Sequence, residues 1–324
     1  MTDVAVIGIG NMGRNHVRIY SEMKECRLVA IADVNRAAEE VAGKFGCRYY
    51  TDYKDMLEKE RPDAVSVCVP TSLHYKVSQD VIKAGCHILI EKPIASSVKE
   101  AEELVRMAKA RGLKLTVGHV ERFNPAVQKL KEIIQTGKLG KVTSLLARRV
   151  GLFPPQIRDA NVVVDLAVHD IDVFNYLLGR RPERVFASAG RALINKREDY
   201  ADIFLRYREA NGLIEVNWIT PVKVRALNAT GTKGYVSLNY ITQELVLYES
   251  NYERSYDRFG DFVVKFGEPK KVIVDIAKAE PLKAELKHFI DCVKNNKEPL
   301  VSGQEAIEVL KAAQQAIESY RRGR

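Results

Sequence analysis

A glycine-rich turn near the N-terminus constrains the fold more than any other feature. Residues 3–10 read DVAVIGIG, and glycines at positions 8, 10 and 13 have the spacing G-x-G-x-x-G. A second apolar segment, RLVAIAD at 27–33, ends in Asp33, which lies 20 residues beyond Gly13. A strand, a glycine turn, a helix and a second strand that ends in an acid form the fingerprint of a dinucleotide-binding site. We therefore predict a Rossmann fold at the N-terminus.

Each residue of this turn has a separate physical task. Gly8 permits the tight turn, Gly10 leaves room for a pyrophosphate, and Gly13 lets the helix pack close to the strand. The helix is predicted to begin near Asn11 and Met12. Its first backbone N–H groups and the positive end of its dipole favour phosphate. These five residues are therefore predicted to contact the cofactor.

The acid after the second strand bears on which cofactor binds. Asp33 would accept hydrogen bonds from the adenosine ribose, and its charge opposes the 2′-phosphate of NADP. Arg36 follows closely and is able to pair with that phosphate. We expect NAD, with NADP as the alternative.

Strands and helices alternate through the first 122 residues, which indicates a doubly wound parallel sheet. Further strands are predicted at 63–69, 86–91 and 113–119, and helices at 35–45, 53–60, 72–84 and 97–111. Ligands of such sheets bind at the carboxyl ends of the strands. The residues that follow the strands are therefore candidate cofactor contacts: Val69, Pro70, Thr71, His74, Glu91 and Lys92.

Length and composition limit the remaining possibilities. A chain of 324 residues with 46% apolar content is too long for one ordinary core, so we expect domains at 1–122 and 123–324. The charge of +9 is spread along the chain, and only YRRGR at 320–324 is a dense basic cluster, so nucleic-acid binding is not expected. No apolar stretch is long enough for a bilayer, and the N-terminus lacks a basic region before its apolar run, so neither a membrane span nor a signal peptide is expected. Five cysteines without metal-ligand spacing suggest free thiols in the cytoplasm.

Three ionisable residues interrupt an apolar run in the middle of the chain. The segment VVVDLAVHDID at 162–172 contains Asp165, His169 and Asp172 at helical spacings i, i+4 and i+7, so all three share one helix face. One ion does not readily reach all three, because they span about 10 Å of helix axis. We therefore expect no metal. His169 is a candidate general base, because its ordinary pKa lies near the working range, and Asp165 is its candidate orienting partner.

Three motifs in order resemble one family over the whole chain. GIGNMGRNH follows the first strand, EKPIA stands at 91–95, and D-x-x-x-H lies within DLAVHDID. Together they resemble the glucose–fructose oxidoreductase/inositol dehydrogenase (Gfo/Idh/MocA) family. The resemblance implies that Lys92, Asp165 and His169 form the catalytic group.

The resemblance also implies the architecture of the second domain. It is expected to be α/β, with a large, open and mainly antiparallel sheet. The strands that fit this sheet are 141–151, 183–193, 201–207, 212–219, 224–231 and 233–240, and closing helices fit at 281–296 and 303–321. In the family the open face of the sheet often forms the subunit contact, so a homodimer or homotetramer is expected.

Two further segments resemble the members that act on nucleotide sugars. They are VGHVERFNPAV at 117–127 and the segment at 157–179. This implies hydride transfer from a secondary alcohol, such as C3 of UDP-N-acetylglucosamine, to the nicotinamide. The alternatives are an inositol or free-sugar dehydrogenase and a non-catalytic dinucleotide-binding regulator. The candidate substrate contacts are His119, Arg122, Asn124, Arg158 and Asp172, and Arg148 and Arg149 are further candidates for a diphosphate.

Overall fold

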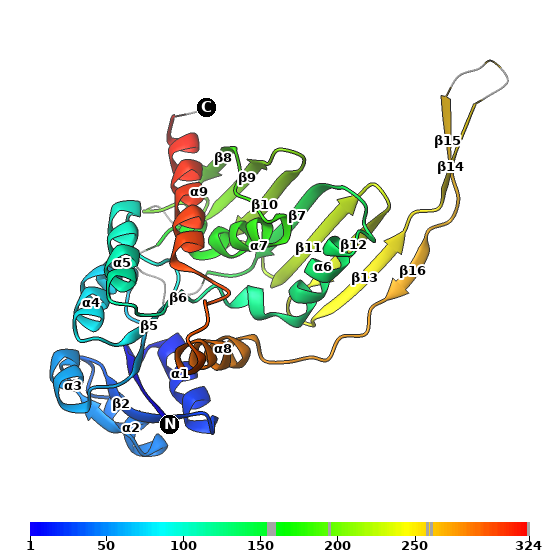
Figure 1. The fold of residues 1–324 in the computed structure, drawn as a ribbon. Coiled ribbons are helices and arrows are strands. Elements are labelled where there is room, and N and C mark those ends of the chain that lie inside the picture. The colour runs from blue at the N-terminus through cyan, green and yellow to red at the C-terminus, as the bar shows by residue number, and fades with distance from the viewer. Residues whose placement is uncertain (154–159, 194–195, 257–258, 260–261, 323–324) are drawn as a thin grey trace. The chain divides into compact units, whose positions relative to one another are not determined.

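The computed structural model describes residues 1–153, 160–193, 196–256, 259 and 262–322. Contacts divide the chain into two units (Figure 1). The first is built mainly from residues 1–123 and 280–311, and the second from most of 124–279 together with 312–322. Within the described ranges, no helix is long and apolar enough to cross a membrane. All five cysteines are free, and Cys26, Cys86 and Cys292 are buried.

The first unit is a parallel sheet with helices on both faces. Its strands are β1 Thr2–Ile7, β2 Cys26–Ala32, β3 Arg48–Tyr50, β4 Ala64–Val67, β5 His87–Ile90 and β6 Leu115–Val117. Its helices include α1 Asn11–Glu22, α2 Ala38–Phe45, α3 Tyr53–Glu60, α4 Thr71–Lys83, α5 Val98–Ala110 and the short 3₁₀ helix η1 Val120–Phe123. The strand order β3-β2-β1-β4-β5-β6 is that of doubly wound dinucleotide-binding folds. The predicted Rossmann fold is confirmed, and β3 is a short strand that the sequence pattern did not predict.

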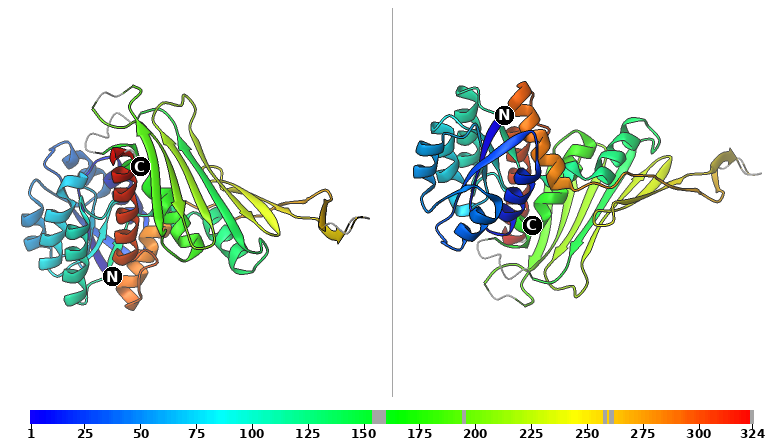
Figure 2. Two further views of the ribbon diagram at one scale, coloured as in Figure 1. Left: turned by 90° about the horizontal axis from the view of Figure 1, so that it is seen from above. Right: turned by 90° about the horizontal axis from the view of Figure 1, so that it is seen from below.

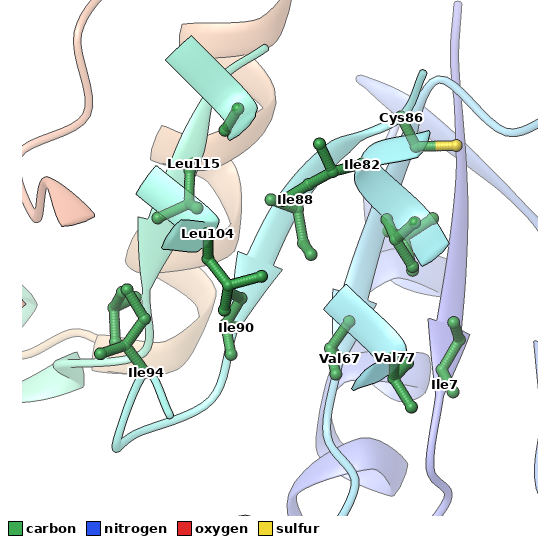
Figure 3. Close-up of a cluster of buried hydrophobic side chains, with 14 of the residues drawn as sticks. Ile7, Val67, Val77, Ile82, Cys86, Ile88, Ile90, Ile94, Leu104 and Leu115 are labelled. Atoms are coloured by element: carbon green, nitrogen blue, oxygen red, sulfur yellow. The ribbon is translucent and has the colours of Figure 1, made fainter. Parts of the chain in front are cut away.

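Alternate residues of the central strands supply two separate cores. Ile7, Val67 and Ile90 face one side of the sheet, where they pack with apolar residues of α4 and α5 (Figure 3). Val4 and Val6 face the other side and pack with α1 and α2. Strands buried on both faces explain why these segments are apolar throughout.

The closing helices do not follow the expected division of the chain into domains at 1–122 and 123–324. They are α8 Pro281–Asn295 and α9 Gly303–Arg322. Leu286 and Phe289 of α8 join the core formed by α1, and Ile307 of α9 joins the opposite core. Residues 280–311 therefore belong to the first unit, because the apolar face of α8 and the first half of α9 complete its two helical layers.

The second unit is a large open sheet with helices on one face. Its sheet contains β7 Val142–Val150, β8 Arg184–Gly190, β9 Tyr200–Arg206, β10 Asn211–Asn217, β11 Val224–Gly231, β12 Gly234–Asn239, β13 Glu244–Glu249 and β16 Lys270–Ile273. The order is β16-β13-β12-β11-β7-β10-β9-β8, and only the β7–β10 pair among these described strands is parallel. The prediction of a large, mainly antiparallel sheet is confirmed.

Helices and a hairpin complete this unit. The helices α6 Pro125–Gln135 and α7 Val168–Leu178 lie on one face of the sheet, and the views of Figure 2 agree on this. A π-helical turn, η2 Val163–Ala167, leads directly into α7. The hairpin of β14 Tyr252–Tyr256 and β15 Phe262–Phe266 extends beyond the edge formed by β13 and β16 (Figure 1).

Candidate functional site

The glycine turn after β1 has the geometry that a dinucleotide needs. Gly8 has φ +88°, and a Cβ there would lie 2.7 Å from the carbonyl of Cys68. A Cβ on Gly13 would lie 1.9 Å from the carbonyl oxygen of Gly8. A Cβ on Gly10 would meet no atom within 4 Å. The turn is therefore closed around Gly8 and Gly13 and open at Gly10, which fits the close approach of a pyrophosphate.

The first turn of α1 lies next to this open position. Asn11 and Met12 are its first residues, and the N-cap residue Gly10 makes no side-chain capping bond. The backbone N–H groups at this end therefore lack the side-chain acceptor that closes most helix starts. Phosphate oxygens are suited to replace it. The residues present thus fit a bound dinucleotide.

Asp33 supports the same turn from the end of β2. Its carboxylate accepts hydrogen bonds from the backbone N–H of Ile9 at 2.5 Å and of Asn35 at 2.8 Å. Tyr49 donates to the backbone carbonyl of Asp33 at 2.9 Å. These bonds fix a half-buried carboxylate beside the glycine turn. Carboxylate oxygens have further acceptor sites for ribose hydroxyls.

His74 links the ends of two neighbouring strands. Its Nε2 lies 2.9 Å from the carbonyl oxygen of Val69, after β4, and its Nδ1 lies 2.7 Å from that of Pro93, after β5. The side chain is 1% exposed. Val69, Pro70 and Thr71 lead into α4. The first turn of this helix places the side chain of His74 against the loop that contains Lys92. His74 holds this edge together, and its predicted contact with the cofactor stays a prediction.

Glu91 is a buried carboxylate next to the candidate catalytic lysine. It accepts a hydrogen bond from Nε2 of His16 at 3.0 Å and another from the backbone N–H of Lys92 at 3.2 Å. Burial acts to raise the pKa of Glu91, but the hydrogen bond and charge of His16, with Lys92 nearby, lower it overall. A Cβ on Gly118, which directly follows β6, would lie 2.9 Å from the carboxylate, so the end of this strand also confines it. The peptide bond from Lys92 to Pro93 is cis.

His16 is a residue of this site that the sequence pattern did not identify. It lies three residues after Gly13 on the buried face of α1, so a polar group stands where apolar residues are usual. That spacing is the signal that could have identified it. His16 joins the cofactor-binding helix to the segment that holds Lys92.

His119 and Arg122 lie just after β6. His119 is 2% exposed. Arg122 is fully buried and donates from Nη1 to the carbonyl of Leu300 at 2.9 Å and to Glu305 at 2.7 Å. Arg122 thus connects η1 to the segment before α9, and its predicted substrate contact remains untested.

In the second unit, Asp165 lies in a π-helical turn and His169 in the regular helix that follows. The i, i+4 and i+7 spacing assumed a regular helix throughout, and this assumption is wrong for Asp165, because η2 ends at Ala167. π turns occur frequently at functional sites. Asp165 and Asp172 are buried, whereas His169 is half-buried. Burial raises the pKa of the Tyr207 phenol, and the nearby Asp172 raises it further.

The neighbouring Asp170 forms a buried ion pair. Arg149 of β7 donates from Nε to Asp170 at 2.7 Å, and Tyr240 donates its hydroxyl to the same carboxylate at 3.0 Å. The guanidinium of Arg149 also lies 4.9 Å from the centre of the Tyr240 ring. Arg149 therefore anchors α7 to the sheet, which argues against the diphosphate contact considered for it.

The other predicted substrate contacts have different outcomes. Asn124 caps α6 by accepting from the N–H of Ala126 at 3.1 Å, and its amide donates to the carbonyl of Tyr240 at 3.0 Å. Arg148 pairs with Glu215. Arg158 lies outside the described residues.

Together, the glycine turn, the acid after β2 and the strand order define a dinucleotide-binding oxidoreductase. Residues 2–119 match the model described as "Oxidoreductase family, NAD-binding Rossmann fold", and residues 127–237 match the "GFO/IDH/MocA C-terminal domain". The chain belongs to the Gfo/Idh/MocA family, and its first unit binds NAD(P).

Individual relatives cover almost the whole chain. UDP-N-acetylglucosamine 3-dehydrogenase from Acidithiobacillus ferrooxidans is 31% identical over 97% of this chain and 97% of its own length. A solved structure of that enzyme superposes with a TM-score of 0.86 at 29% identity, covering 98% of this chain and 97% of that one. The scyllo-inositol 2-dehydrogenase (NAD(+)) of Bacillus subtilis is 30% identical over 98% of this chain and 94% of its own length.

Proposed function

We propose that this protein oxidises the C3 hydroxyl of a nucleotide sugar, such as UDP-N-acetylglucosamine, with NAD. The observation that carries the proposal is the near full-length likeness, in sequence and in fold, to an enzyme named for that reaction. Lys92 and the Asp165–His169 pair supply the groups that alcohol oxidation requires. Asp33 supports NAD over NADP, because its carboxylate would repel a 2′-phosphate.

The chain's own residues have separate roles in this reaction. The glycine turn and Asp33 would hold NAD, which would supply the acceptor for the hydride of the sugar carbon. Lys92 donates a hydrogen bond to the reacting oxygen and stabilises the negative charge that develops there. His169 takes the hydroxyl proton, and Asp165 stabilises the resulting imidazolium. The buried Glu91 fixes the backbone at Lys92 through its hydrogen bond to that N–H.

A second candidate reaction is oxidation of an inositol. It is favoured by the B. subtilis relative, whose identity to this chain is almost as high as that of the nucleotide-sugar enzyme. The two candidates share the cofactor and the catalytic roles and differ in whether the substrate has a nucleotide. Absorbance of NADH at 340 nm during incubation with NAD and UDP-N-acetylglucosamine, N-acetylglucosamine, myo-inositol or scyllo-inositol separates them. Turnover of free sugars or inositols without turnover of the nucleotide sugar would overturn the proposal.

The catalytic role of Lys92 is tested by Lys92→Met. The methionine has similar length but no charge or donor, so turnover is expected to fall by about a hundredfold or more. Lys99→Met, at an exposed position on α5, is the matched control and is expected to retain wild-type turnover. Full activity of a folded Lys92→Met protein, checked by its melting temperature, would reject the assigned mechanism.

A further inference from the structure

The only tryptophan of the chain has an unsatisfied donor in the second unit. Trp218 directly follows β10 and is 2% exposed. Its backbone N–H donates to the carbonyl of Asp199 at 2.9 Å. Its indole Nε1 is buried and has no hydrogen-bond partner among the described residues. A buried N–H without an acceptor is costly, so this group requires an explanation.

A phenyl ring and a guanidinium group lie close to this indole. Phe153 meets Trp218 edge to face, with ring centres 5.2 Å apart. The guanidinium carbon of Arg197 lies 5.5 Å from the centre of the Phe153 ring and 5.8 Å from that of Trp218. Phe153 and Trp218 follow β7 and β10, which are parallel and paired at Val150 and Asn217. Both rings therefore come from the same end of the sheet.

The two acids that follow Arg197 accept hydrogen bonds from neighbouring groups. Glu198 accepts from Arg191 at 3.3 Å and from Asn161 at 3.2 Å. Burial acts to raise the pKa of Glu198. The hydrogen bonds from the backbone, Arg191 and Asn161 outweigh burial and lower this pKa, so the carboxylate is ionised. Asp199 accepts from the backbone N–H groups of Ala192 and Leu193 at 2.8 and 2.6 Å.

A second guanidinium lies at this end of the sheet. Arg225 donates to the carbonyl of Val150 at 2.6 Å, and the ideal Cβ of Gly151 would lie 3.8 Å from its guanidinium. Arg197 and Arg225 favour an anionic ligand, whereas the two aromatic rings favour a planar one.

This cluster is connected to the segment that contains the candidate catalytic pair. Asn161, which donates to Glu198, also accepts from the backbone N–H of Val164 at 3.1 Å. The π-helical turn with Asp165 begins two residues later, at Val163, and packs against β10. A ligand at Trp218 would therefore lie at the end of β10, the strand against which the turn with Asp165 packs.

We infer that Trp218, Phe153 and Arg197 form the recognition site for the nucleoside diphosphate part of the substrate. The indole N–H donates to an oxygen of that group, and Arg197 contacts its charge or its base. The inference rests on the proposed function, which it deepens by assigning the residues that recognise the part of the substrate remote from the reacting carbon.

The single tryptophan makes the test direct. Full-length protein without NADH is titrated with UDP while tryptophan emission is recorded. A saturable change in emission is expected with UDP, and none with N-acetylglucosamine or myo-inositol at the same concentrations. Unchanged emission with UDP would overturn the inference, provided that calorimetry gives the same answer.

Two variants make the test independent of fluorescence. In calorimetry, Trp218→Phe keeps a ring but removes the donor, and is expected to weaken UDP binding about fivefold. Arg197→Gln is expected to weaken it about tenfold or more. Arg208→Gln, in the exposed turn between β9 and β10, is the matched control and should bind UDP as the wild type does. NADH binding should be unchanged in all three.

The outcomes separate this inference from the proposed function. If UDP-N-acetylglucosamine is oxidised with unchanged KM by both Trp218→Phe and Arg197→Gln, the inference fails and the function stands. If UDP binds with the expected losses in the variants but no nucleotide sugar is oxidised, the inference stands and the proposed reaction fails.

Discussion

At the scale of single residues, glycines in the first unit have different physical roles that substitution can separate. Gly13→Ala is expected to destabilise the protein by about 1–3 kcal/mol, because its Cβ would meet the carbonyl oxygen of Gly8. Gly10→Ala should leave stability nearly unchanged, since its Cβ meets no atom, but should weaken NAD binding at least about tenfold. Urea denaturation and NAD titration measure the two effects.

A third glycine provides the control for helix propensity. Gly43 lies in α2, and a Cβ there also meets no atom within 4 Å. Gly43→Ala should retain NAD binding and stabilise the protein by up to about 1 kcal/mol. Equal loss of NAD binding in Gly10→Ala and Gly43→Ala would show that the open position at Gly10 is not the pyrophosphate site.

Cofactor choice is also a matter of one residue. Asp33→Asn removes the negative charge but keeps one acceptor oxygen for the backbone N–H groups of Ile9 or Asn35. The ratio of kcat/KM for NAD to that for NADP should fall at least about tenfold, because repulsion of the 2′-phosphate is lost. Steady-state kinetics with both cofactors measures this ratio, and an unchanged ratio would mean that Asp33 does not select the cofactor.

The sequence revealed those side chains whose roles follow from the local backbone. Gly8, Gly13 and Asp33 stand at fixed offsets from predicted strands, so their geometry was predictable. The Arg149–Asp170 and His16–Glu91 pairs were not, because each joins residues 21 or 75 positions apart. Such pairs depend on tertiary packing, which periodicity does not encode.

At the scale of elements, the His16–Glu91 bond joins α1 to the end of β5. The pKa of Glu91 is lower in the folded protein than its ordinary value, so the folded state binds fewer protons than the unfolded state between those pKa values. Its stabilising contribution is therefore fully present above the ordinary pKa of glutamate, about 4.3, and is lost as pH falls through the lower folded value.

Glu91→Gln tests this linkage. At about pH 7 the variant should unfold at lower urea than the wild type, and the difference should shrink as pH falls below about 4. Glu39→Gln, which changes an exposed carboxylate of α2, should produce no comparable pH-dependent difference. A difference between Glu91→Gln and wild type that stays constant with pH would contradict the assigned ionised pair.

The π-helical turn shows where element prediction reached its limit. The apolar pattern identified a helix at residues 162–172, but a period of 3.6 residues does not distinguish a π turn from an α turn. The strands β3, β13 and β16 were also missed, and β3 and β16 are too short, at three or four residues, for a clear alternation. The central strands of both sheets, such as β1 and β4 and β7 and β10, were predictable because burial on one or both faces leaves a long pattern.

At the scale of the whole molecule, the open face of the large sheet presents an apolar row. Leu146, Leu213, Phe204 and Phe186 are register partners across β7, β10, β9 and β8. Leu146, Leu213 and Phe186 are 44–45% exposed. Their strand neighbours on the other face, such as Ala147 and Ile214, are buried. Contiguous exposed apolar side chains are typical of interaction sites, which supports assembly of identical subunits through this face.

Substitution within this row tests that assembly. Leu213→Lys places a charge at its centre, so the dimer or tetramer should dissociate, with at least about a tenfold weaker association constant. Sedimentation velocity over a range of concentrations measures this. Ile241→Lys, at an exposed apolar position outside the row, should leave the sedimentation coefficient unchanged. A wild-type protein that is monomeric at all concentrations would refute the expected assembly.

The division into two units was predictable in outline, whereas the return of residues 280–311 to the first unit was not. The end of the first unit at Phe123 lies next to the predicted boundary at residue 122. The apolar faces of α8 and α9 identified both helices, but the prediction placed both in the second domain, whereas residues 280–311 belong to the first unit. Their placement depends on the shape of the cores that Leu286 and Ile307 enter.

The proposed reaction is tested most directly by following one hydrogen atom. The full-length protein is incubated with NAD and UDP-N-acetylglucosamine that carries deuterium at C3, and the NADH formed is analysed by mass spectrometry. Hydride transfer from C3 predicts one deuterium on the reduced nicotinamide, and Lys92→Met should form little of this product. Unlabelled NADH, or NADH formed only with inositols, would contradict the proposed reaction.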